Sequence, residues 1–78
     1  MSTKLKQDIS IGANLRKLRK RAGLSQEQAS AQLQLRGLSV SREMLSQMEL
    51  GKYSIRIGVL LALKEIYHAE IQDFFIDL

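Results

Sequence analysis

The chain has 78 residues, of which 45% are hydrophobic and 26% charged, and its formal net charge is +4. A chain of this length buries only about 60–65% of the surface that it exposes when unfolded, which indicates one small domain and disfavours a large enzyme cleft. The absence of cysteine excludes disulfides, thiolate zinc sites and cysteine nucleophiles. The longest apolar run, residues 59–63, is too short for a membrane span, and no secretory pattern is visible. We expect a cytoplasmic protein with no membrane partner.

Charge is distributed unevenly along the chain. Residues 1–24 contain seven Lys and Arg residues against one Asp, whereas residues 65–78 contain four acidic residues and no Lys or Arg. A basic end and an acidic end favour a protein with one side facing a polyanion. The basic cluster at residues 16–21 could also be a solvated helix face, and contact with DNA is favoured for part of it only if a DNA-binding motif lies beside it.

Apolar spacing, caps and glycines predict an all-α fold of five helices within a domain at residues 10–78, preceded by an arm at residues 1–9. The first helix is expected to begin near Asp8 or Ser10, either of which could be its N-cap. Its apolar stripe consists of Ile11, Leu15, Leu18 and Ala22. A capping box of Ser25 and Gln28 predicts the start of a second helix, which runs to about residue 36 and turns at Gly37.

Three further helices are expected after this turn. Ser41 is the predicted cap of a helix at residues 42–50, with Leu45 and Met48 toward the core. The fourth helix is outlined by Ile57, Leu60, Leu61, Lys64 and Tyr67, with Leu63 and Ile66 also on its inner face. A last short helix carries Ile71, Phe74, Phe75 and Leu78. Five short helices with capped turns predict a compact α-bundle.

The second and third helices, joined by a glycine turn, have the layout of a helix-turn-helix. The segment LRKLRKRAGLSQ at residues 15–26, followed by MELGK at residues 48–52, resembles the phage-repressor and Cro-like (XRE) helix-turn-helix family. The resemblance covers about residues 10–76 and implies a lambda-repressor-like bundle with its helix-turn-helix core at about 26–50. Residues 34–40 lengthen the usual spacing, which predicts a second helix extended by about a turn and could tilt the recognition helix.

The resemblance also assigns roles to individual residues. Base contacts are implied for Arg42, Glu43 and Gln47 in the recognition helix. Contacts to the DNA backbone are expected for Gln26, Ser41, Ser46, Lys52, Tyr53 and Arg56. A structural ion pair buried between helices is implied for Arg19 and Glu49. By base chemistry Arg42 suits guanine, Gln47 adenine and Glu43 cytosine, each pair giving about 1–3 kcal/mol of discrimination, unless Glu43 pairs with Arg42 instead.

Other features are weaker or have a simpler interpretation. The last helix carries more apolar surface than a monomer needs, so Ile71, Phe74, Phe75 and Leu78 are candidate dimerisation residues, unless the two phenylalanines only close the core. The single histidine, His68, lacks companion ligands, so no metal site and no cofactor are expected. No nucleophile–base or acid–base constellation is present, which argues against an enzyme.

Taken together, these patterns predict a sequence-specific regulator of transcription that binds double-stranded DNA. We expect a repressor that acts as a homodimer on a palindromic site, with regulation by its concentration or by a partner such as an antirepressor or a toxin. The alternative is a protein-interaction module that keeps the helix-turn-helix fold and binds another protein through residues 70–78.

Overall fold

The structure is a computed structural model, and it describes residues 10–77. This range contains four α-helices and a C-terminal 3-10 helix, with no strand. In chain order they are α2 (Gly12–Arg21), α3 (Gln26–Leu35), α4 (Arg42–Glu49), α5 (Ile57–Ile66) and η2 (Ile71–Phe75). The all-α prediction is confirmed, but the prediction of five α-helices is wrong, because the last segment is a short 3-10 helix. The predicted arm at residues 1–9 and Leu78 lie outside the described residues.

The predicted N-caps of α3 and α4 are confirmed, whereas that of α2 differs. Ser25 and Gln28 form the capping box, with Gln28 N donating to Ser25 Oγ at 3.0 Å and Ser25 N donating to Gln28 Oε1 at 2.8 Å. Ser41 caps α4 by accepting from the backbone N–H of Met44 at 3.1 Å. The N-cap of α2 is Ile11 rather than Ser10, although Ser10 Oγ still accepts from Gly12 N at 3.1 Å. Asp8, the other candidate, lies outside the described residues.

All four α-helices end in the same way. Each is followed by a residue with positive φ, which lets two backbone N–H groups turn back to the carbonyls of the last turn. Three of these positions are glycines, at φ values between 76° and 83°. The fourth is His68, at φ 53°, so α5 ends in a left-handed conformation that costs a side chain about 1 kcal/mol.

The core is built from one buried stripe of each helix together with Val40 from the turn. Leu15 and Leu18 of α2 and Leu45 and Met48 of α4 are buried, as predicted. The prediction for α5 is wrong at two positions, because Ile57 is 71% exposed and Leu61 48% exposed. The buried residues of α5 and its cap are Val59, Leu60, Leu63, Ile66 and Tyr67. All of the first seven residues of this helix are apolar or glycine, so apolar spacing alone does not determine which side faces inward.

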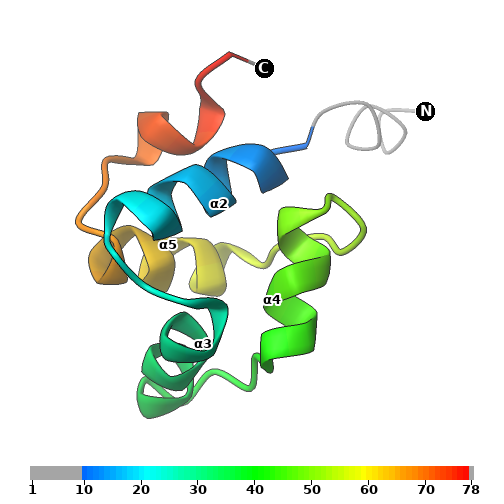
Figure 1. Cartoon of the computed structure of the whole chain (residues 1–78), viewed down its shortest axis with the longest axis vertical. Helices are drawn as coiled ribbons and strands as arrows, with labels where there is room; N and C mark the ends of the chain where they lie inside the picture. The colour runs from blue at the N-terminus through cyan, green and yellow to red at the C-terminus, as the bar shows by residue number, and fades with distance from the viewer. Residues whose placement is uncertain (1–9, 78) are drawn as a thin grey trace.

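α2 lies between η2 and the other α-helices, as Figure 1 shows. η2 packs against α2 at the opposite end of the molecule from α3, and Asn14 holds it there by donating from Nδ2 to the carbonyls of Phe74 at 2.9 Å and Ile76 at 2.8 Å. These side-chain bonds anchor the C-terminal segment to α2. On its other side α2 packs against α4 at Gly12, where a Cβ would lie 2.4 Å from the carbonyl oxygen of Glu49.

The lengthened turn between α3 and α4 is fixed to α3 by side chains. Ser30 Oγ donates to the carbonyl of Val40 at 2.6 Å, and Gln34 Nε2 donates to the same carbonyl at 3.2 Å. The helix itself ends at Leu35, and residues 36–41 form the connection to α4. Ser30 therefore orders the turn by a hydrogen bond.

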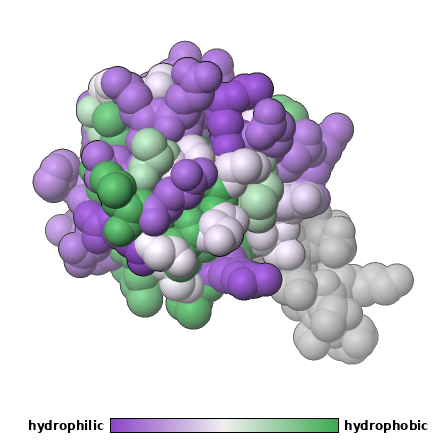
Figure 2. All heavy atoms as spheres, turned by 90° about the horizontal axis from the view of Figure 1, so that it is seen from below, coloured by the Kyte–Doolittle hydropathy of each residue, from purple (hydrophilic) through white to green (hydrophobic). Residues whose placement is uncertain are grey.

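The described surface retains several large hydrophobic side chains. They are Leu35, Leu50, Tyr53, Ile57, Leu61, Ile71, Phe75 and Ile76. Seen from the end at which α3 finishes and α4 begins, hydrophobic residues interrupt a mainly hydrophilic surface (Figure 2). No helix in residues 10–77 is long and apolar enough to span a membrane.

Candidate nucleic-acid interface

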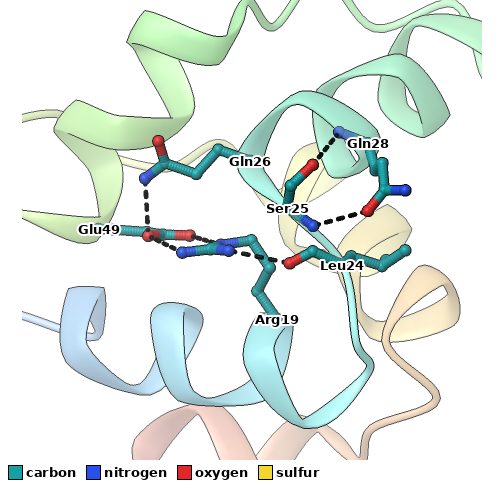
Figure 3. Close-up of polar contacts among 6 residues, drawn as sticks. All are labelled: Arg19, Leu24, Ser25, Gln26, Gln28 and Glu49. Carbon is teal, nitrogen blue, oxygen red and sulfur yellow. Dashed lines mark hydrogen bonds and ion pairs between the residues drawn. The ribbon is translucent and has the colours of Figure 1, made fainter.

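A buried ion pair joins α2 to the end of α4 (Figure 3). Arg19 Nε donates to Glu49 Oε2 at 2.7 Å and Arg19 Nη2 donates to Glu49 Oε1 at 3.1 Å, with side chains only 8% and 2% exposed. The remaining guanidinium edge donates to the carbonyl of Leu24 at 2.9 Å. The hydrogen bonds to Glu49 raise the pKa of Arg19 above its usual value, against the opposing effect of burial. The pair thus holds the two helices at a fixed separation.

Gln26 contributes to this ion pair instead of standing free. Its Nε2 donates to Glu49 Oε1 at 3.0 Å, so the carboxylate of Glu49 has a third side-chain donor (Figure 3). The sequence predicted that Gln26 contacts a DNA phosphate. The structure places Gln26 at the N-terminus of α3, where its side-chain amide already donates one hydrogen bond to Glu49. Its first structural role is therefore to connect α3 to the Arg19–Glu49 pair.

A basic depression lies beside the N-terminus of α3. Its walls are formed by Arg16, Arg19, Lys20, Ser25, Gln26, Glu27 and Arg42. Arg16 and Lys20 are exposed and one turn apart on α2, and Arg42 reaches the depression from the first turn of α4. Free backbone N–H groups at a helix N-terminus and nearby cations both attract anions. The arrangement can accept an anionic oxygen, although Glu27 also contributes one carboxylate to the wall.

The outward face of α4 is polar and lies opposite its buried stripe. Helical geometry puts Glu43, Ser46 and Gln47 on this face, whereas Leu45 and Met48 face the core. Arg42 lies at the edge of the face and turns toward the depression, while its Nη2 lies 3.6 Å from Glu43 Oε2. The structure thus separates the three expected base-contacting residues into an outward pair, Glu43 and Gln47, and a flanking cation.

The loop after α4 carries the remaining residues assigned to the DNA backbone. Lys52, Tyr53 and Arg56 are all exposed and lie between the end of α4 and the start of α5. None of them lines the basic depression. Exposed cations thus lie in two separate segments, the α2–α3 region and the loop that joins α4 to α5.

The C-terminal segment fits the dimerisation prediction only in part. Phe74 is 0% exposed and fills the core of a single copy, so its assignment to a dimer contact is wrong. Ile71 and Phe75 are exposed, and Leu78 lies outside the described residues. Phe74 and Phe75 are adjacent in sequence, and the 3-10 turn directs one inward and the other outward.

Sequence reasoning missed several residues that position this surface. Gly12 allows the close approach of α2 and α4, and Asn14 holds the C-terminal segment. Neither has a recognisable local signal, because each depends on a segment distant in sequence. Arg16 and Lys20 were visible as a basic i, i+4 pair, but only the fold shows that they share a depression with Arg42. Among residues 10–77, no group of three or more His, Cys, Asp or Glu side chains could hold a metal ion.

Comparison with known proteins places this geometry in a family. No curated protein and no solved structure matches the chain significantly. A family model described as a helix-turn-helix domain matches residues 10–73, which is most of the chain and includes every element from α2 to the middle of η2. The chain therefore belongs to the helix-turn-helix domain family, and this membership indicates a DNA-binding regulator in general terms.

Proposed function

We propose that this protein is a sequence-specific transcription regulator that binds double-stranded DNA with α4 in the major groove. The observation that carries the proposal is the polar outward face of α4, together with the exposed cations in the α2–α3 region and the α4–α5 loop. In protein–DNA complexes, contacts to phosphates position the protein and contacts to base edges specify the sequence. The phage-repressor and Cro-like (XRE) type of helix-turn-helix is the subfamily that we infer, with a non-enzymatic, cytoplasmic role.

The roles follow from where each side chain lies. Glu43 and Gln47 are one turn apart on the outward face and suit the N4 amino group of cytosine and the N6/N7 edge of adenine. Arg42, with Arg16 and Lys20, surrounds the N-terminus of α3 and suits a phosphate better than a base. This modifies the sequence-based assignment, in which Arg42 reads guanine.

Further phosphate contacts are proposed for the loop and for the caps. Lys52, Tyr53 and Arg56 can reach the backbone beyond the end of α4. Ser41 and Ser46 are partly buried, so their hydroxyls are secondary candidates. Repression requires only that the regulator occupies its site, and a homodimer on a palindrome doubles the contacts made by one copy. Control by an antirepressor or a toxin that binds the same protein completes the proposal.

Fluorescence anisotropy with random-sequence duplexes across a salt series, followed by selection and sequencing of the bound fraction, tests the proposal. We expect binding that weakens steeply with salt and a selected site with two-fold symmetry. Replacing Arg16 and Lys20 together by Ala should weaken binding to all sequences and lower the salt slope by about 2. Lys17→Ala is the matched control, because Lys17 is exposed on the same helix and does not line the depression.

Replacing Glu43 and Gln47 together by Ala should instead change the selected sequence and leave the salt slope nearly unchanged. An unchanged preference would refute the assignment of α4 as the reading helix. Failure of the unmodified protein to bind any duplex at low salt would refute the DNA-binding function and favour the protein-interaction module, whose exposed candidates are Ile71, Phe75 and Ile76.

A further inference from the structure

Leu50 is a large apolar side chain that α4 presents to solvent. It is 64% exposed and forms the C-cap of the helix. Its backbone keeps a right-handed helical conformation, with φ −85° and ψ −2°, and its N–H donates to the carbonyl of Ser46 at 3.1 Å. The helical repeat of side-chain positions therefore extends through Leu50.

This repeat places Leu50 on the outward face of α4. Leu50 follows Gln47 by three residues, Ser46 by four and Glu43 by seven, and these intervals bring side chains to one side of a helix. A single exposed leucine is ordinary on a protein surface. This one, however, lies among the polar side chains that are proposed to meet DNA, and at 64% exposure it contributes little burial to the folded monomer.

The closed end of α4 fixes the direction of Leu50. Gly51 follows with φ 78° and turns the chain back, so that the N–H of Lys52 donates to the carbonyl of Gln47 at 2.9 Å. Glu49, the residue before Leu50, is held by its buried ion pair. Leu50 thus projects from an ordered helix end, which suits a contact of defined direction.

The major groove contains one kind of apolar group that suits a leucine. The other groups on its base edges are hydrogen-bond donors and acceptors, whereas a pyrimidine methylated at C5 presents a methyl group there. Thymine carries this methyl group in every A·T pair, and 5-methylcytosine carries it in a modified G·C pair. A leucine side chain cannot donate a hydrogen bond to a phosphate oxygen, so it does not suit the backbone contacts that position a protein on DNA.

We propose that Leu50 is a specificity-determining residue that contacts the C5-methyl group of a pyrimidine in the major groove. The inference rests on the proposed function, because it requires α4 to lie in the groove. The rise of about 1.5 Å per residue puts Leu50 about 4.5 Å beyond Gln47 along the axis of α4. Base pairs follow one another at about 3.4 Å, so with α4 along the groove the methyl group belongs one or two base pairs beyond the base that Gln47 contacts.

Changing single methyl groups in the DNA tests this contact. The probe is the duplex recovered by selection, in which each thymine is replaced in turn by deoxyuridine, which lacks only the C5-methyl group. Loss of the contacted methyl group should raise the Kd of the unmodified protein about fourfold, which corresponds to about 0.8 kcal/mol for one buried carbon. A second series replaces each cytosine in turn by 5-methylcytosine, and a fourfold fall in Kd at one position identifies that base as the methyl donor instead.

Variants of Leu50 connect the methyl group to this side chain. Leu50→Ala should abolish the dependence of the Kd on the methyl group, whereas Leu50→Met, which keeps an apolar side chain of similar volume, should retain it. Leu35→Ala is the matched control, because Leu35 is 81% exposed on α3 and lies off the outward face of α4. It should bind and respond to the methyl group as the unmodified protein does. Far-UV circular dichroism of each variant checks that it is folded.

The outcomes separate this contact from the DNA-binding function. Sequence-specific binding that no single methyl group affects overturns the inference and leaves the proposed function in place. A methyl dependence that Leu50→Ala retains also overturns the inference, because another side chain then makes the contact. Failure to bind any duplex at low salt, or binding that selects no sequence, overturns the proposed function and the inference with it.

Discussion

Glu49 is the residue whose removal we expect to destabilise the fold most. Its carboxylate accepts from Arg19 at 2.7 and 3.1 Å and from Gln26 at 3.0 Å, and its side chain is 2% exposed. Glu49→Ala leaves the buried guanidinium with one hydrogen bond, to the carbonyl of Leu24. Breaking a buried ion pair on one side costs about 3–5 kcal/mol. A domain of this length has a total stability of roughly 4–12 kcal/mol, so much of it would be lost.

Urea unfolding at pH 7, followed by far-UV circular dichroism, measures this loss in the free energy of unfolding. In a thermal unfolding experiment the same loss corresponds to a fall in Tm of at least ~12 °C. The exposed pair of Arg42 and Glu43, whose closest atoms lie 3.6 Å apart, is the control, and Glu43→Ala should change stability by less than about 0.5 kcal/mol. Replacing Arg19 and Glu49 together by Met should be less damaging than Glu49→Ala, because no charge is left buried alone. A cost for Glu49→Ala no larger than that for Glu43→Ala would refute the reasoning.

Three further predictions, two of them with a control substitution, are tested by the same unfolding assay. Gly12→Ala should destabilise the protein by about 1–3 kcal/mol, since the new Cβ would meet the end of α4 at 2.4 Å. Gly58→Ala is the control, because the space around this position is open, and it should stabilise the monomer. Equal effects of the two substitutions would contradict the close approach of α2 and α4. His68→Gly should stabilise the protein by about 1 kcal/mol, because glycine adopts φ 53° without the steric cost that a side chain has there. A lower stability of this variant would show that contacts of the histidine side chain outweigh the backbone strain. Tyr67 has a buried hydroxyl with no hydrogen-bond partner among the described residues, so Tyr67→Phe should be nearly neutral at pH 7. Burial, and secondly the charge of Glu49, raises the pKa of Tyr67. As the pH rises above about 10, the tyrosine hydroxyl therefore loses its proton in the unfolded state but not in the folded state. The free energy of unfolding should then fall by up to ~1.4 kcal/mol per pH unit. Tyr67→Phe should reduce this alkaline loss and Tyr53→Phe, at a half-exposed position, should not.

The sequence predicted the elements that local chemistry determines. Ser25 with Gln28, and Ser41, cap their helices because a hydroxyl or amide needs only a backbone N–H two or three residues away. Gly37 stops α3 because the turn needs positive φ. These interactions span a few residues, so spacing in the chain is enough to identify them.

What the sequence did not predict depends on contacts between distant segments. The rotation of α5 about its axis is one example, because Ile57 and Leu61 are as apolar as the residues that are buried. The direction of Phe74 is another, since it follows from the two hydrogen bonds that Asn14 makes to the C-terminal segment. The split between Arg42 and the outward pair on α4 likewise depends on where α2 and α3 lie.

The position of α4 is set at both of its ends by residues that need not touch DNA. At its start, Ser30 and Gln34 hold the carbonyl of Val40, one residue before the cap, so the lengthened turn is anchored to α3 and not left to its own flexibility. At its end, Gly12 admits the backbone of Glu49 against α2. A displacement at either end would move the whole outward face of a helix of only eight residues. Substitutions at these positions should therefore weaken recognition of the correct site more than attraction to DNA in general, because phosphate attraction tolerates small displacements and base-edge hydrogen bonds do not.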